Sequence, residues 1–195
     1  MDLSLPQLIA VSAIPVILAI TLHEAAHAYV AWRLGDPTAR AQGRVTANPF
    51  KHIDPVGTLL VPGLILLAGK LAGGGLAYFG WAKPVPVVAG NLRSPRRDMG
   101  LVAAAGPVAN ILMAIAWGLG FKLALLAGTS DATGEFMLRM CRVGVLVNLV
   151  LAVLNLIPVP PLDGGRILIS VLPGGLAAAL SRLEPYGLMI LLALL

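Results

Sequence analysis

The chain has 195 residues, of which 58% are hydrophobic and 12% are charged, and its mean hydropathy is +0.89. Soluble domains carry roughly 25% charged residues, so this composition indicates an integral membrane protein and excludes an ordinary soluble domain. The net charge of +5 comes from Lys and Arg gathered in two stretches. It therefore indicates how the chain is oriented in a lipid bilayer, and no nucleic-acid partner is expected.

A long helix is predicted over residues 5–34. The stretch from Leu5 to Leu22 contains no charged residue. A helix of roughly 30 residues is about 45 Å long, which exceeds the hydrocarbon core of a bilayer, so the helix must tilt or protrude. Gly35 and Pro37 follow it, and this punctuation predicts that the helix stops there.

The second half of this helix carries the motif His23-Glu24-x-x-His27. On a helix, residues i and i+4 share one face, so both imidazoles can bind one metal ion. The arrangement suits a zinc site in which the Glu24 carboxylate takes a proton from a water that the metal activates. The alternative is two surface histidines on a helix, but ionisable groups beside an uncharged apolar span are by default functional.

Residues 39–97 are predicted to form a strand and re-entrant region. Residues 44–50 alternate weakly and contain turn formers, which indicates a short membrane-associated strand or β-hairpin. Basic residues occur both in this stretch and in the loop after residue 82. If both loops are cytoplasmic, the apolar segment between them enters the membrane and returns on the same side, and the metal motif lies near the cytoplasmic face.

Residues 100–127 and 137–157 are each predicted to span the membrane. The second span returns the chain to the side of the histidine motif, together with the segment 158–166, which contains Leu-Asp-Gly. A C-terminal helical part is expected over residues 167–195. The sequence ends inside an apolar stretch, and we expect that part of the C-terminal segment is missing.

Two further residues join the candidate site. Asp163 is the best third metal ligand, since a catalytic zinc generally needs three protein ligands and its Pro and Gly neighbours favour a non-helical backbone there; the alternative is an ordinary Asp-Gly turn. Asn155, at the end of a span, either stabilises an oxyanion or forms an interhelical hydrogen bond. Asn110 and Asn148 are assigned interhelical hydrogen bonds. Other residues of the loops are expected to cap or solvate them, or to mark the membrane boundary: His52, Asp54, Asp98 and Arg166.

Three motifs in order, LHEAAHAYVAWRLGD, GPVAN and NLIPVPPLDGGRIL, resemble those of the site-2 protease family, peptidase family M50, which are intramembrane zinc metalloproteases. The match runs from about Thr21 to Arg166. The chain is similar to minimal members, because it is too short to hold an added PDZ or CBS domain. The resemblance implies that His23, His27 and Asp163 bind zinc and that Glu24 is the catalytic base. It also implies that Asn155 assists substrate binding or stabilises the transition state.

Together these features predict an all-α polytopic membrane protein in which broken helices surround a buried metal site, with a small β-hairpin or strand region. Residues 1–195 are expected to form a single metalloprotease domain that binds one zinc ion and cleaves transmembrane segments of membrane proteins in regulated intramembrane proteolysis. The expected location is the bacterial cytoplasmic membrane. The alternatives are a membrane zinc transporter and a scaffold that does not cleave, and the sequence does not indicate an oligomeric state.

Overall fold

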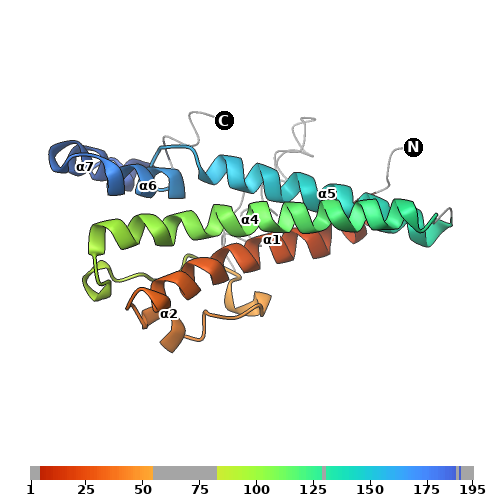
Figure 1. Ribbon diagram of the computed structural model, residues 1–195, viewed down its shortest axis with the longest axis horizontal. Helices are drawn as coiled ribbons and strands as arrows, with labels where there is room; N and C mark the ends of the chain where they lie inside the picture. Colours follow the sequence, from red (N-terminus) through yellow and green to blue (C-terminus); the bar gives the residue numbers. More distant parts are fainter. Residues whose placement is uncertain (1–4, 55–82, 129–130, 188, 190–195) are drawn as a thin grey trace, which may run out of the picture.

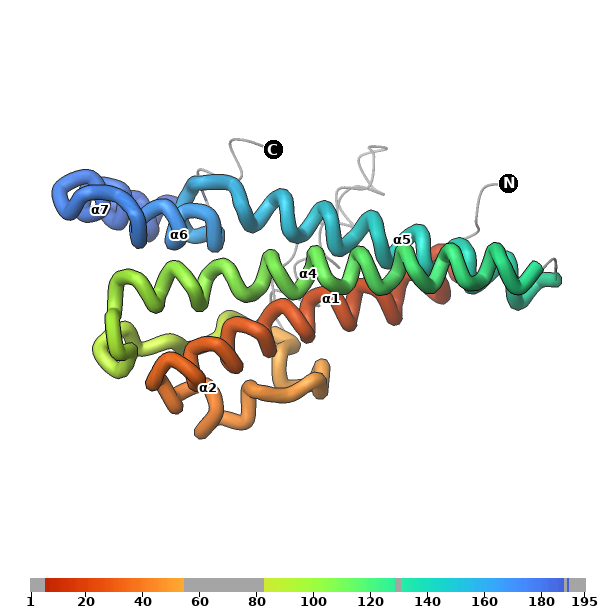
Figure 2. The backbone as a smooth tube through the Cα atoms, in the orientation of Figure 1, coloured from red at the N-terminus to blue at the C-terminus, as the bar shows by residue number. Residues whose placement is uncertain are grey.

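Three long helices lie side by side in the computed structural model, which describes residues 5–54, 83–128, 131–187 and 189. Figure 1 shows α1 (Leu5–Arg33) and α5 (Ala132–Asn155) packed along α4 (Pro95–Leu126), and α1 and α5 also contact each other. The tube in Figure 2 shows that α4 runs back along α1 and that α5 returns. The end of α5 therefore lies at the same end of the bundle as the end of α1.

Short helices gather at this end of the molecule (Figure 1). They are α2 (Thr38–Ala41), α6 (Asp163–Val171) and α7 (Gly174–Ser181), and α6 packs against both α4 and α7. Among the described residues, 3-10 turns lie in the connecting segments and near the C-terminus: Pro49–Lys51, Ala89–Asn91 and Glu184–Tyr186.

α1, α4 and α5 are each long and apolar enough to cross a membrane. Large apolar side chains on their outer faces are exposed, among them Leu112, Leu119 and Leu123 of α4 and Leu146 and Val153 of α5. In lipid such a surface has no hydrophobic penalty, and the helical hydrogen bonds satisfy the backbone inside each span. The protein is therefore a multi-pass, mostly helical membrane protein, as the composition predicts.

α1 ends where the sequence predicts. Gly35 has a φ of 115°, a left-handed conformation that favours glycine. Its N–H donates to the Trp32 carbonyl at 3.2 Å, and the Asp36 N–H donates to the Ala31 carbonyl at 2.9 Å. This pair of bonds is the Schellman motif, which satisfies carbonyls that a helix end leaves open. The histidine motif therefore lies two turns before a firmly terminated helix end.

Small residues let the long helices approach closely. Ala19 and Ala28 of α1 and Ala103 of α4 are buried. A Cβ on Gly144 of α5 would stand 2.4 Å from the Trp117 ring of α4. The α4 backbone can thus come close to both of its long neighbours, and this proximity brings polar side chains of all three helices together.

The predicted strand at residues 44–50 is wrong, and none of the described residues forms a strand. The Thr46 hydroxyl accepts a hydrogen bond from the Asn48 N–H at 3.2 Å, and the Asn48 side chain accepts one from the Phe50 N–H at 3.0 Å. These local bonds occupy donors that a sheet would use, and they fold the segment into turns. The re-entrant prediction falls largely on residues 55–82, outside the described residues.

Two helices begin earlier than their predicted starts at 100 and 137. Pro95 occupies the first turn of α4, and the Asp98 carboxylate accepts a hydrogen bond from the Ser94 N–H at 2.8 Å. At the start of α5, the Asp131 side chain accepts one from the Gly134 N–H at 2.8 Å. Both carboxylates satisfy N–H groups that lack a helical partner, so each of these acidic residues lies at the start of a helix, before the residue at which the span is predicted to begin.

A buried carboxylate fixes the loop that follows α1. Asp36 is fully buried, and it accepts hydrogen bonds from the Val88 N–H at 2.7 Å, the Asn91 amide at 3.0 Å and the Thr38 N–H at 3.1 Å. Burial by itself would raise the pKa of Asp36, but these bonds outweigh it and hold the pKa below its ordinary value. The segment 83–94 is thereby tied to the end of α1.

Candidate metal centre

Two imidazoles from α1 face one another in the interior of the bundle. His23 and His27 are both buried, with 7% and 8% of their surface exposed. Their rings stand edge to face at 85°, and their Nε2 atoms are 3.0 Å apart. The i, i+4 spacing on a regular helix therefore produces the shared face that the sequence predicts.

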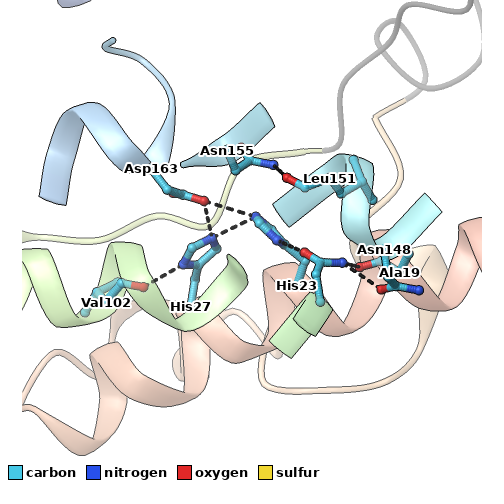
Figure 3. Close-up of polar contacts among 9 residues, drawn as sticks. Ala19, His23, His27, Val102, Asn148, Leu151, Asn155 and Asp163 are labelled. Atoms are coloured by element: carbon cyan, nitrogen blue, oxygen red, sulfur yellow. Dashed lines mark hydrogen bonds and ion pairs between the residues drawn. The ribbon is translucent and has the colours of Figure 1, made fainter. Parts of the chain in front are cut away.

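Asp163 brings a carboxylate to the same point from the other end of the chain (Figure 3). Its Oδ2 lies 3.3 Å from Nε2 of His23 and 3.4 Å from Nε2 of His27. The expectation of a non-helical backbone at Asp163 is wrong, because Asp163 is the first residue of α6. A carboxylate is favourable at a helix N-terminus, where unpaired N–H groups carry partial positive charge.

Two glycines after Asp163 allow the tight approach to α6. A Cβ on Gly164 would lie 2.3 Å from the Leu156 carbonyl oxygen, and one on Gly165 would lie 2.4 Å from the Pro160 nitrogen. Both positions are closed to any larger residue unless the backbone shifts. The Asp163-Gly164-Gly165 sequence is therefore a packing requirement of the turn that delivers the carboxylate.

The hydrogen bonds around the rings determine which nitrogens carry protons. Nδ1 of His27 lies 2.7 Å from the Val102 carbonyl oxygen, and Nδ1 of His23 lies 2.5 Å from Oδ1 of Asn110. Both partners are acceptors, so each neutral ring carries its proton on Nδ1. The Nε2 atoms then present lone pairs towards each other and towards Asp163.

This donor set fits a zinc ion. Oδ2 of Asp163 is buried and has no hydrogen-bond partner among the residues that the structure describes. Two lone pairs and a carboxylate oxygen within 3.0–3.4 Å repel one another unless a cation lies between them. Zinc bonds of about 2.0–2.1 Å at tetrahedral angles place ligand atoms about 3.3 Å apart, close to the spacing found here. Three protein ligands leave one position for water or substrate.

α4 closes one side of this cluster through a glycine. A Cβ on Gly106 would stand 2.4 Å from Nε2 of His27 and 2.6 Å from Nε2 of His23. The site therefore exists only because residue 106 has no side chain. Gly106 and Asn110 both lie in the GPVAN segment, and the prediction from sequence includes neither of them in the site itself. A small residue followed four positions later by an amide, inside an apolar span, is the sequence signal that could have found them.

Glu24 and Asn155 flank the cluster without joining it. Glu24 is half-buried beside the two histidines on α1, and no described residue hydrogen-bonds its carboxylate. Asn155 is the last residue of α5, and its Nδ2 donates to the Leu151 carbonyl at 2.9 Å (Figure 3). Three of the five predicted site residues thus meet directly. Glu24 is adjacent to them, and Asn155 is turned towards its own helix.

The competing polar residues have other roles. His52 is 1% exposed, and its Nε2 donates to the Thr46 carbonyl at 3.0 Å. Asp98 begins α4, as described above. Arg166 forms an exposed ion pair with Glu184 at 3.1 Å. Asn110 and Asn148 form the expected interhelical hydrogen bond at 2.9 Å, but Asn110 also contacts a proposed metal ligand. Among the described residues, His23, His27 and Asp163 make up the one group suited to a metal ion.

Comparison with known proteins places these features in a family. The family model described as "Peptidase family M50" matches residues 122–195, which include Asn155 and Asp163. The "Putative zinc metalloprotease YwhC" of Bacillus subtilis (strain 168) is 42% identical over 189 residues, covering 93% of this chain and 78% of the relative. No solved structure matches the chain.

Two mycobacterial relatives are more distant. The "Putative zinc metalloprotease Rip2" of Mycolicibacterium smegmatis is 32% identical over 179 residues, covering 92% of this chain and 64% of the relative. The protein of the same name from Mycobacterium tuberculosis H37Rv is 29% identical over 181 residues, covering 91% and 63%. The chain thus spans just under two thirds of the length of these two proteins. With the long match to the Bacillus protein, these findings show that the chain belongs to peptidase family M50, the site-2 proteases.

Proposed function

We propose that this zinc metallopeptidase hydrolyses peptide bonds within or near transmembrane segments of other membrane proteins, as a step of regulated intramembrane proteolysis. His23, His27 and Asp163 hold the zinc ion, and Glu24 is the catalytic base. The proposal rests on the chemistry of the site, on the family and on the apolar helices that carry the ligands.

One observation carries the proposal. Two imidazole lone pairs and an otherwise unpartnered carboxylate oxygen converge within 3.4 Å, next to a second carboxylate that no described residue binds. A structural role would satisfy these groups with hydrogen bonds, because a buried polar atom without a partner destabilises a fold by about 1–3 kcal/mol. A metal centre with an adjacent base uses all four residues.

The chain's own residues divide the reaction between them. When bound, zinc supplies Lewis-acid polarisation of the scissile carbonyl and of the attacking water. Glu24 accepts the proton that this water releases and returns it to the leaving nitrogen. His23, His27 and Asp163 keep the metal at a fixed depth, and their neutral rings and single carboxylate leave the centre with net positive charge, which favours the developing oxyanion.

Asn155 is proposed to orient the substrate carbonyl. Its side chain lies at the end of α5, close to the turn that leads to Asp163. In the present structure its Nδ2 donates to the Leu151 carbonyl, so binding a substrate requires rotation of the side chain. The Leu151 carbonyl keeps a helical partner, the Asn155 N–H, so this rotation leaves no buried carbonyl unpaired.

We further propose that the site faces the cytoplasm of a bacterial cell. Supporting this, the end of the bundle nearest the metal centre carries most of the basic residues, and the opposite end carries fewer. The basic residues at the end near the metal centre include Arg33, Arg40, Arg93, Arg96, Arg97 and Arg166. The described basic residues at the opposite end are Lys122, Arg139 and Arg142. Arg40 stacks on the Trp32 ring at 4.1 Å, an arrangement suited to a membrane interface. The transporter and scaffold alternatives are not favoured, since the relatives are named as metalloproteases.

Cleavage of a model transmembrane substrate by the purified protein in detergent tests the proposal. The wild type, Glu24→Gln and the control Glu184→Gln, whose ion pair with Arg166 is exposed, are compared, and the zinc content of each is measured. We expect wild type and control to cleave, and Glu24→Gln to retain zinc while its rate falls by roughly 10²–10⁴-fold. If zinc is bound and neither wild type nor control cleaves any of a panel of transmembrane substrates, the proposal is wrong.

A further inference from the structure

A continuous chain of buried hydrogen bonds connects α5 to the metal centre through α4 (Figure 3). Nδ2 of Asn148 donates to the Gly144 carbonyl at 2.9 Å, and Oδ1 of Asn148 accepts from Nδ2 of Asn110 at 2.9 Å. Oδ1 of Asn110 accepts from Nδ1 of His23 at 2.5 Å. Both asparagines are fully buried, so no solvent can replace a partner that is lost.

The direction of this chain is fixed by two backbone carbonyls. The Gly144 carbonyl can only accept, so Asn148 must turn its NH₂ group towards it and its oxygen towards Asn110. The Ala19 carbonyl also accepts from Nδ2 of Asn110, at 3.3 Å. Both hydrogens of Asn110 are then used, and its oxygen faces His23. The one tautomer of neutral His23 that satisfies this oxygen carries its proton on Nδ1.

Reversing either amide would place two acceptors or two donors face to face in a dry interior. A buried polar group without a partner destabilises the fold, so the reversed arrangement is strongly disfavoured. The orientation of Asn110, and with it the tautomer of His23, is therefore fixed jointly by Asn148, at the shorter distance of 2.9 Å, and by the Ala19 carbonyl at 3.3 Å. His27 differs, because its Nδ1 donates to a backbone carbonyl, that of Val102, which no side-chain substitution removes.

We propose that Asn148 is a positioning residue for the metal centre: through Asn110, it sets the Nδ1–H tautomer of His23 and so directs the Nε2 lone pair to the zinc ion. Asn148 acts on His23 only through Asn110, and we call these two hydrogen bonds, from Asn148 to Asn110 and from Asn110 to His23, the relay. The inference rests on the metal site of the proposed function, and it adds that a residue on a helix carrying none of the three ligands controls zinc affinity.

The tautomers can be read by nitrogen NMR of the metal-free protein, labelled with ¹⁵N at histidine and held in detergent. The chain has three histidines and each ring has two nitrogens, so three pairs of ring-nitrogen signals are expected. His23 and His27 should both be protonated on Nδ1. His52 should be protonated on Nε2, because this nitrogen faces the Thr46 carbonyl, and its signal serves as an internal reference for the opposite tautomer.

Asn148→Leu removes the relay from its far end. The His23 signal should then move towards a mixture of tautomers, while the signals of His27 and His52 stay unchanged. The zinc dissociation constant should rise by about 10-fold, and for Asn110→Leu by up to about 100-fold, the range found for outer partners of metal-bound histidines. Met140→Ala is the matched control on α5: it removes a buried side chain outside the relay and should leave tautomers and zinc affinity unchanged.

Two results would overturn the inference. One is an Nε2–H tautomer of His23 in the wild type, which decides the question whether or not the variants fold. The other is a folded Asn148→Leu protein whose His23 signal and zinc affinity match those of the wild type. A wild-type protein that binds no zinc would instead refute the proposed function. The tautomer measurement uses the metal-free protein, so it would still test whether the relay sets the tautomer of His23.

Discussion

Gly106 lies against His27 so closely that a Cβ at this position would stand 2.4 Å from the ring's Nε2. The α4 backbone thus forms one wall of the metal centre, and the ligands of α1 keep their positions only while residue 106 lacks a side chain. This contact links the packing of two membrane spans directly to the chemistry of the site.

Gly106→Ala should therefore abolish zinc binding in a protein that still inserts into detergent micelles. The added methyl group must displace the ring of His27 or His23, because real side chains do not approach so closely. Gly118→Ala is the matched control on the same helix, since its Cβ would meet one atom, of Val145, at 4.0 Å. Zinc content measured after dialysis checks the prediction. Equal zinc content in the two variants would contradict it.

Removal of zinc should destabilise the wild type. A ligand that binds only the folded state stabilises it by about 2.7 kcal/mol when its concentration is about 100 times its dissociation constant. A chelator should thus lower the unfolding temperature of the wild type and leave that of Asp163→Asn nearly unchanged. Asp131→Asn, which keeps a good helix cap far from the site, should respond as the wild type does. A chelator effect of the same size in Asp163→Asn would show that Asp163 is not a ligand.

Asp36 should make stability depend on acidic pH. Its folded-state pKa lies below the ordinary value of 3.8, so the ionised carboxylate stabilises the fold fully above that value. This contribution is lost as the pH falls through the folded-state pKa. Asp36→Asn should destabilise the protein by about 1–3 kcal/mol near neutral pH, because the amide cannot accept all the bonds of the carboxylate.

The check is the unfolding temperature of wild type and Asp36→Asn between about pH 6 and about pH 3. The gap between them should narrow at the acidic end. A constant gap over this range would mean that the charge of Asp36 contributes nothing, and that the variant acts by altering the shape of the loop alone.

The sequence predicts the metal ligands because His, Glu and Asp are rare beside apolar spans, so each stands out. It also predicts the end of α1, since Gly35 has a required left-handed backbone. The strand at residues 44–50 fails as a prediction because Thr46 and Asn48 bond locally to the backbone, and alternation alone does not reveal this competition. The sequence does not predict that Gly106 and Asn110 border the site, because their proximity to the ligands depends on how α4 crosses α1.

Asn155→Ala should affect substrate handling and not the metal. The side chain touches none of the proposed ligands, and its one hydrogen bond among the described residues stays within its own helix. We expect unchanged zinc content and a drop in kcat/KM of roughly 10-fold or more, as for the loss of an oxyanion donor. Steady-state cleavage kinetics with parallel metal analysis measure both. Loss of zinc in this variant would instead assign Asn155 to the metal centre.

The most direct test of the central claim is X-ray absorption at the zinc edge of the purified protein. The chain has three histidines and one cysteine, so few ligand sets are possible. We predict two imidazoles and carboxylate or water oxygens at about 2.0–2.2 Å, with no sulfur. The spectrum should be the same in a His52→Ala variant. A third imidazole or a thiolate in the zinc spectrum would contradict the site formed by His23, His27 and Asp163.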